Sequence, residues 1–368
     1  MKKKKVLLHL LFLLFSVCSV AFVSNAQADQ ISFYVTPKLP DNQITPNAGF
    51  FYLKMSPNQQ EQTSVTLTNN SDQSVTVDIT PASAKTANSG MVSYMPLPKI
   101  SNDPSLQYDL TKYMKVESKV TIPAKQSVEV PVTITMPNAT FDGVIAGGLT
   151  FKQEGQQTKP AKNAHGVSVI NNYQFVMAVV IRQNMNIIPP VISLKSVEPS
   201  QVNSRNVVNI GLQNSAKAFL NNMAMHIDIK GVDRNNSNVH FKQDEQNLQM
   251  APNSNLEWHY RLNGKSFIPG KYHTIVEVWG DQSVTGTYSD TVNGKTTKYT
   301  HYWKFEKDFT ITEQKAQSLN KSDVSIPKPQ INWSLWIIIG LTVLIIILAF
   351  LLILAKRRKK EEEEEITE

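Results

Sequence analysis

The sequence is almost free of cysteine. Cys18 is the only cysteine among the 368 residues, and it lies in an N-terminal stretch that we expect to be removed. A secreted protein that lacks disulfides has to be stabilised by apolar burial and strand pairing. A small disulfide-stapled fold is therefore excluded, and so is a metal site built on thiolates.

Signatures of common catalytic sites are also absent. The sequence contains no H-E-x-x-H, no G-x-S-x-G, no P-loop and no G-x-G-x-x-G. The histidines after residue 28 show no close metal-ligand spacing, and adjacent carboxylates such as Asp244 and Glu245 would point to opposite faces of a strand. We therefore expect no enzyme, no cofactor and no metal. Basic and acidic residues nearly balance over residues 29–332, so no nucleic-acid partner is expected.

Long apolar runs occur only at the two ends. The run from Trp333 to Ala355 carries no charge and is long enough, as a helix, to cross a bilayer of ~30 Å. Five basic residues (356–360) and five glutamates (361–365) follow. Because basic residues stay on the cytoplasmic side, residues 356–368 are predicted to be cytoplasmic and the preceding chain extracellular.

The N-terminus is typical of a secretory signal peptide. Four lysines precede an apolar stretch, and Ala26-Gln27-Ala28 matches an A-x-A cleavage site, which places the cut between Ala28 and Asp29. A retained anchor and a lipoprotein modified at Cys18 are the alternatives. Val17 disfavours the second, because lipidation signals prefer a small residue at that position.

Between the ends, apolar and polar residues alternate with a period of two. Residues 128–136 place Val128, Val130, Val132, Ile134 and Met136 on one face. Pro131 indicates an edge strand, because proline cannot donate to a ladder. Many short strands separated by Asn, Gly and Pro predict an all-β fold of two tandem immunoglobulin-like antiparallel β-sandwiches, followed by a single C-terminal transmembrane helix.

Pro189-Pro190 ends a strand pattern and predicts an extended boundary between the two sandwiches. About 300 extracellular residues also exceed one ordinary core. The polar stretch before the apolar run is predicted to be a loose coil that spans roughly 25 Å. The predicted segments are a signal peptide (1–28), two β-sandwiches (29–188 and 189–313), a linker (314–332), a transmembrane helix (333–355) and a cytoplasmic tail (356–368).

Binding residues are harder to identify. Phe51 and Tyr52 follow Phe50 directly, so a strand must direct at least one ring outward, where it could stack on a sugar or anchor a protein. Asp142 precedes Gly143 and is a third candidate, although turn chemistry alone explains such a pair. The aromatic residues of the second sandwich fit core positions better than a partner site.

Several longer motifs occur in order along the chain. Near its start stands "ISFYVTPKLPDNQ", followed by "SAKTANSGMVSY" and "FDGVIAGGLTF", and its second half contains "LQMAPNSNLEWHYRLNGKSFIPGKY". Taken in this order, these motifs resemble the WxL-interacting proteins, a family of cell-surface proteins of Gram-positive bacteria. "MSPNQQ" departs from the family's usual Pro-Gly turn, and residues 280–303 look longer than usual, with Asn293-Gly294 predicting an added hairpin.

The resemblance implies two binding domains. It assigns peptidoglycan to the first sandwich, and WxL-domain proteins and host components to the second. The main hypothesis is a membrane-anchored extracellular scaffold in the cell wall that binds peptidoglycan and tethers WxL-domain proteins. One alternative is an adhesin for host matrix proteins, and another, of a different class, is a cell-wall-modifying enzyme.

Overall fold

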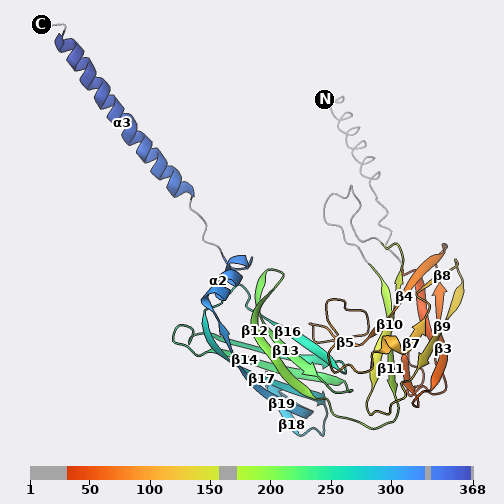
Figure 1. Cartoon of the computed structure of the whole chain (residues 1–368). Helices are drawn as coiled ribbons and strands as arrows, with labels where there is room; N and C mark the ends of the chain where they lie inside the picture. Colours follow the sequence, from red (N-terminus) through yellow and green to blue (C-terminus); the bar gives the residue numbers. More distant parts are fainter. Residues whose placement is uncertain (1–30, 157–171, 328–332, 366–368) are drawn as a thin grey trace, which may run out of the picture.

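The structure is a computed structural model that describes residues 31–156, 172–327 and 333–365. It contains two β-sandwiches, built from residues 33–182 and 192–311, a short helix α2 and a long C-terminal helix α3 (Figure 1). The predicted all-β fold of two immunoglobulin-like sandwiches followed by one apolar helix is confirmed. The predicted signal peptide and its cleavage site at Ala28 and Asp29 lie outside the described residues.

The first sandwich packs a four-stranded sheet on a five-stranded sheet. All strand pairs are antiparallel except β2 with β11. In sheet order, the strands are β1 (Phe33–Lys38), β3 (Gln60–Asn69), β9 (Ser127–Thr135) and β7 (Met114–Val116) in one sheet, and β2 (Phe51–Lys54), β11 (Gln174–Arg182), β10 (Ile145–Gln153), β4 (Val75–Ser83) and β8 (Lys119–Ile122) in the other.

Strand β9 shows how the alternating pattern builds this core. Val130, Val132 and Ile134 are at most 1% exposed, while the residues between them face outward. The prediction that Pro131 marks an edge strand is wrong, because β9 lies between β3 and β7. The proline is tolerated because β7 pairs only as far as Val132 and leaves the flank of Pro131 open.

The second sandwich packs a three-stranded sheet on a five-stranded sheet. Trp258 and Trp303 pack against its core, as predicted, whereas Trp279 and Tyr299 are buried in a separate small cluster with Ala224. In sheet order, the strands are β12 (Ile192–Val202), β13 (Arg205–Asn214) and β16 (Ser254–Arg261) in one sheet, and β15 (His240–Met250), β14 (Leu220–Gly231), β17 (Gly270–Gln282), β19 (Lys295–Ile311) and β18 (Tyr288–Val292) in the other.

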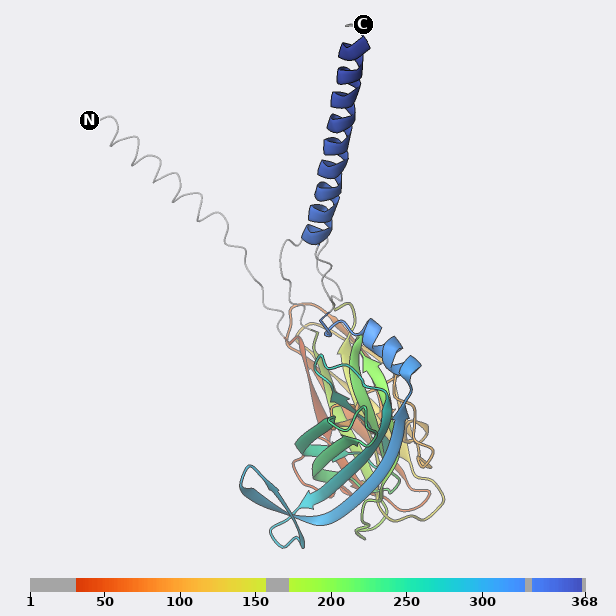
Figure 2. The same ribbon diagram turned by 90° about the vertical axis from the view of Figure 1, so that its left-hand side faces the viewer.

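The hairpin predicted at Asn293-Gly294 is confirmed. Strands β18 and β19 pair directly from Val292 to Lys295, and both turn residues have positive φ, 50° and 77°. Two positive φ values in a two-residue loop are the signature of a type I′ turn, which matches the twist of the strands. The hairpin projects from the end of the second sandwich that lies away from α3 (Figure 2).

The loose coil predicted for residues 314–332 is wrong for its first half, because residues 314–322 are helical. Helix α2 (Glu313–Ser322) begins at the N-cap Thr312 and buries Ala316 and Leu319 against the second core. Its C-cap Asp323 accepts a hydrogen bond of 2.8 Å from the backbone N–H of Asn206. The helix escaped the sequence pattern because only two of its residues are apolar and buried.

We predict that Leu319→Ala will loosen α2 from the sandwich. Leu319 is 9% exposed, and shortening a buried leucine to alanine costs about 2–4 kcal/mol. Hydrogen exchange of the α2 amides should therefore accelerate, while exchange in β13 stays slow. Ser318→Ala, on the exposed face, is the matched control and should leave the helix protected. Equal protection in both variants would show that α2 does not dock in solution.

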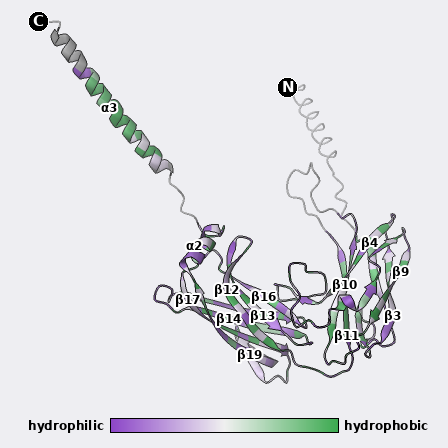
Figure 3. Ribbon diagram, in the orientation of Figure 1, coloured by the Kyte–Doolittle hydropathy of each residue, from purple (hydrophilic) through white to green (hydrophobic). Residues whose placement is uncertain are grey.

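Helix α3 (Trp333–Glu365) is the one helix of the described residues that is long and apolar enough to cross a membrane, over Trp336–Arg357. Its middle is continuously hydrophobic, unlike the mixed surfaces of the two sandwiches (Figure 3). The helix continues through the basic and glutamate residues of the predicted tail as far as Glu365. Eight residues separate Trp333 from Ser325, which is tied to Asp323, so the second sandwich is at most roughly 28 Å of chain from α3.

Candidate functional site

The two sandwiches contact each other through a segment that follows β4. This segment forms the short ladder of β5 (Lys85–Thr86) and β6 (Val92–Ser93), and it contacts β15 and β16 of the second sandwich. Thr86 is fully buried. Its hydroxyl accepts from the Ala251 N–H at 2.9 Å and lies 2.6 Å from the Ser254 hydroxyl. The motif "SAKTANSGMVSY" thus forms part of the contact between the sandwiches.

Further contacts hold the same interface. Gln213 donates to both carboxylate oxygens of Asp103 at 2.9 Å, and the Val144 N–H donates to the Lys217 carbonyl at 2.8 Å. A small apolar cluster fills the space between the sandwiches: Ala84, Val144, Ala146, Val180 and Ala251, flanked by Tyr52, Val92, Tyr94 and Phe219. The boundary at Pro189-Pro190 therefore joins two sandwiches that also touch through side chains and backbone.

One histidine of this interface is hydrogen-bonded through both ring nitrogens. Between Asn88 and Asn209, His259 donates from Nδ1 to Asn209 Oδ1 at 2.8 Å and accepts from Asn88 Nδ2 at 2.9 Å, which requires the neutral ring. Burial lowers the pKa of His259 below its ordinary value of 6.5, with Glu257 opposing and Arg261 supporting that shift.

We predict that acidification weakens the contact. Because the pKa of His259 is lower in the folded than in the unfolded protein, the unfolded state binds the proton first as the pH falls. The contribution of His259 to stability is therefore fully present above pH ~6.5 and is lost as the pH drops below that value. Thermal melting from pH 7.5 to 5 should show the loss. His259→Gln should flatten that part of the profile, whereas an unchanged slope would exclude His259 as its source.

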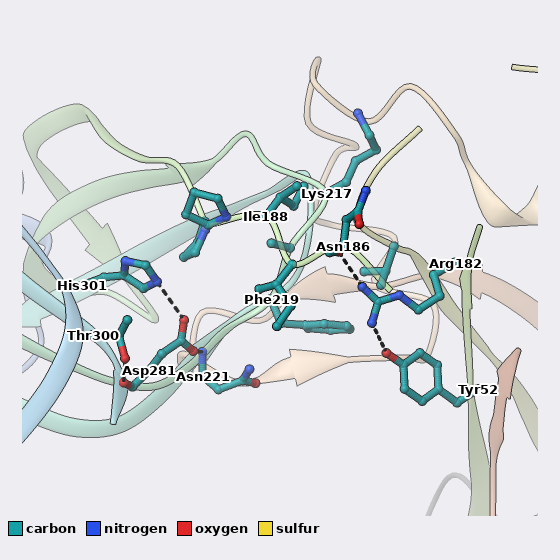
Figure 4. A pocket seen from close by; sticks show the side chains of 16 residues that line it. Tyr52, Arg182, Asn186, Ile188, Lys217, Phe219, Asn221, Asp281, Thr300 and His301 are labelled. Atoms are coloured by element: carbon teal, nitrogen blue, oxygen red, sulfur yellow. Dashed lines mark hydrogen bonds and ion pairs between the residues drawn. The ribbon is translucent and has the colours of Figure 1, made fainter. Parts of the chain in front are cut away.

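A groove of about 640 Å³ lies at this interface. Its walls come from the end of β11, from the connector 186–190 and from the second sandwich at 217–221, 281 and 300–301 (Figure 4). Neither sandwich forms the groove alone. Any ligand held there would touch both domains at once.

Arg182 forms one wall of the groove. It is the last residue of β11 and is 8% exposed. Its Nη1 donates to the Tyr52 hydroxyl at 2.8 Å and its Nη2 donates to the Asn186 carbonyl at 2.7 Å. The buried Nε has no hydrogen-bond partner among the described residues. Both partners of the guanidinium are neutral.

The opposite wall carries a carboxylate. Asp281 Oδ2 lies 3.5 Å from His301 Nε2, and Asp281 Oδ1 accepts from the Asn221 N–H at 3.1 Å. The backbone at Asp281 has a φ of 56°, and its carbonyl accepts from the Thr300 hydroxyl. In Figure 4 the ring of Phe219 lies between this wall and Arg182. The groove therefore has a cation at one side and a carboxylate at the other.

The three candidate binding residues predicted from the sequence lie in three different environments. Phe51 is fully buried in the first core, so its ring offers no surface to a ligand. Tyr52, the next residue, points the other way and lines the groove. Asp142 is exposed and accepts from Asn184 and Asn186 at 2.8 and 3.0 Å, and these hydrogen bonds lower its pKa. It lies beside the connector but does not line the groove.

A second groove lies on the outer face of the five-stranded sheet of the first sandwich. It measures about 560 Å³ and is lined by residues of β4, β8, β10 and β11 together with Met95. Thr150, 6% exposed, has a buried hydroxyl without a partner among the described residues. At its rim Lys119 pairs with Glu154 at 2.8 Å and Asp78 at 3.4 Å. Hydroxyl and charged groups on a concave sheet face can bind a polar polymer.

No group of three or more His, Cys, Asp or Glu that could hold a metal occurs within the described ranges. The residues that line the interface groove were not found from the sequence, apart from Tyr52. Arg182 had one usable signal, since it is a charged residue at the end of the apolar strand "QFVMAVVIR". No sequence pattern places it opposite Asp281 and His301.

Comparisons with known proteins match both halves of the chain. Residues 33–153 match the model of the WxL Interacting Protein, peptidoglycan binding domain, and residues 164–321 match that of the WxL Interacting Protein, host binding domain. The second match begins before β11, although the structure pairs β11 with strands of the first sandwich. The comparison with curated proteins gives no match.

Solved structures similar to this chain include bacterial fimbrial chaperones. A chaperone–tip adhesin complex of CFA/I fimbriae is 12% identical, covers 68% of this chain and 94% of its own, and has a TM-score of 0.29. A chaperone–tip subunit complex from the archaic Csu pili of Acinetobacter baumannii is 11% identical, with 62% and 90% covered and a TM-score of 0.26. Neither similarity bears on function at these scores.

Proposed function

Because the chain belongs to the WxL-interacting protein family, whose domains bind at the cell surface, we propose that it is a membrane-anchored scaffold in the cell wall. Its first sandwich binds peptidoglycan, and its second tethers WxL-domain proteins. The observation that carries the proposal is the match of two binding domains to two sandwiches that are joined by an interface and followed by an apolar helix.

The anchor gives the scaffold its position. An apolar helix of this length suits a bilayer of ~30 Å, and the basic residues that follow it favour a cytoplasmic C-terminus. Docking of α2 leaves a short tether, so the second sandwich stays close to the outer leaflet. This geometry supports a role inside the wall more than an adhesin that reaches host matrix proteins, which remains the second candidate because the second domain's family carries a host-binding description.

We propose binding and no catalysis, and the grooves support this. The second groove presents the ammonium groups of Lys119 and Lys152 on a sheet face of the first sandwich, whereas the Thr150 hydroxyl is buried. Such groups donate hydrogen bonds to glycan oxygens but lack an activated nucleophile. Cleavage of purified wall polymer by the protein would instead support the alternative hypothesis of a wall-modifying enzyme.

Co-sedimentation with purified sacculi tests the wall-binding half. The full-length chain in detergent should sediment with sacculi at low salt. An unrelated membrane protein in the same detergent, which has no such sandwich, should stay in the supernatant. A chain that remains soluble in the presence of sacculi would remove the peptidoglycan role.

Crosslinking in intact cells tests the tethering half. Attachment sites placed on exposed residues of the second sandwich should capture a secreted WxL-domain protein. Protease protection in the same cells should show the two sandwiches digested from outside and the C-terminal tail protected. Capture of host protein alone would favour the adhesin, and a protected pair of sandwiches would overturn the topology.

A further inference from the structure

The guanidinium of Arg182 is a buried cation without an anion. It is 8% exposed, its two hydrogen-bond acceptors are neutral, and Nε has no partner in the described part of the chain. Buried charges in proteins are normally paired, because the lost hydration has to be replaced. A guanidinium also has five N–H donors in a planar fork that fits a carboxylate. The missing counter-ion is best explained by an acidic ligand.

The other side chains of the groove further limit the chemical class of ligand that would fit it. Lys217, from the second sandwich, also lines the groove, but its side chain points away from Phe219 in Figure 4, and Asp281 supplies a carboxylate on the opposite wall. The Phe219 ring between the two ends suits an apolar portion of the ligand (Figure 4). A ligand with a carboxylate, an apolar middle and an ammonium group would complement all three.

The size of the groove suits a short segment and not a whole folded domain. A groove of about 640 Å³ is within the usual range for small-molecule sites and holds only a few amino-acid residues. A neutral sugar would leave Arg182 unpaired, whereas a short peptide with a free carboxylate and an amine would not. In the cell wall, the peptide stems of peptidoglycan have both groups.

We propose that the interface groove binds the peptide stem of peptidoglycan, with a stem carboxylate on Arg182 and a stem ammonium at Asp281. The proposal rests on the wall-binding function proposed above and extends the binding site from the first sandwich to the second. Because the walls of the groove come from both domains, stem binding stabilises their contact. The wall would thereby hold the second sandwich in one orientation.

The first test needs no variant. Binding of two synthetic stem peptides to the full-length chain in detergent is measured by calorimetry, one peptide ending in a free carboxylate and the other in an amide. A charge-assisted fork on Arg182 predicts that the acid binds roughly tenfold more tightly or better. Equal binding of acid and amide, or no binding of either, would overturn the proposal.

Substitutions test whether Arg182 is the residue that binds the carboxylate of the stem peptide. Arg182→Gln should remove the preference for the acid, and Arg182→Lys should restore only part of it, because lysine lacks the planar fork. Lys115→Gln, on the exposed face of β7, is the matched control and should keep the full preference. The acid peptide should also raise the melting temperature of the wild type and of Lys115→Gln, but not of Arg182→Gln.

The outcomes separate this inference from the scaffold function. A chain that sediments with sacculi but does not distinguish acid from amide keeps its wall role and loses the groove assignment. A chain that fails both tests loses both. If Arg182→Gln leaves stem binding intact but abolishes capture of a secreted protein, the groove holds a short segment of a protein partner and the stem assignment is wrong.

Discussion

Val130→Asp is expected to unfold the first sandwich. Val130 is 1% exposed, and its cross-strand partner on β3 is Val65, also 1% exposed. A carboxylate at this position would lose its hydration with no cation or donor to replace it. Such a substitution costs about 4 kcal/mol or more, which is a large part of the stability of an ordinary domain.

Thermal melting followed by circular dichroism checks this prediction. The first sandwich of the variant should be unfolded before heating, so that the remaining transition is smaller than that of the wild type and reports the second sandwich alone. Thr135→Asp, on the same strand but exposed, is the control and should stay within roughly 0.5 kcal/mol of the wild type. A Val130→Asp protein that melts like the wild type would mean that β9 presents its other face to the core.

Much of the fold was predictable because it depends on local pattern. The alternation in β9 fixed which residues face the core, and Asn293-Gly294 fixed a hairpin register. Both follow from the geometry of a strand, in which neighbouring side chains point to opposite faces. The edge-strand prediction from Pro131 was wrong because it used only the missing N–H donor of proline, and that rule says nothing about how far the neighbouring strand β7 extends.

The candidate site could not be predicted in the same way. The aromatic rings of Tyr52 and Phe51 make both residues candidates for ligand binding in the sequence, yet Phe51 lies in the core. Arg182 and Asp281 lie 99 positions apart and face one groove only because the two sandwiches dock. That docking depends on buried hydroxyls such as that of Thr86, and no periodicity in the sequence reports it.

Gly143→Ala should separate the two sandwiches. Gly143 has a φ of +89°, and a Cβ there would overlap the carbonyl oxygen of Lys217 in the second sandwich. The same carbonyl accepts a hydrogen bond of 2.8 Å from the Val144 N–H. Because the obstacle is backbone, the added methyl group forces the two chains apart and removes that hydrogen bond. We expect a loss of several kcal/mol at the interface, from steric overlap and lost pairing together.

Gly155→Ala isolates this effect. Gly155 also has a positive φ, of +75°, but a Cβ there meets nothing within 4 Å, so its substitution adds only the backbone strain of about 1–2 kcal/mol. In scanning calorimetry the control should melt as one coupled unit, like the wild type, whereas Gly143→Ala should show two separate transitions. Since both variants have the same strain, any difference between them measures contact across the interface. If Gly143→Ala melted in one transition like the control, Gly143 would not lie against the second sandwich, and the docked arrangement that shapes the groove would be wrong.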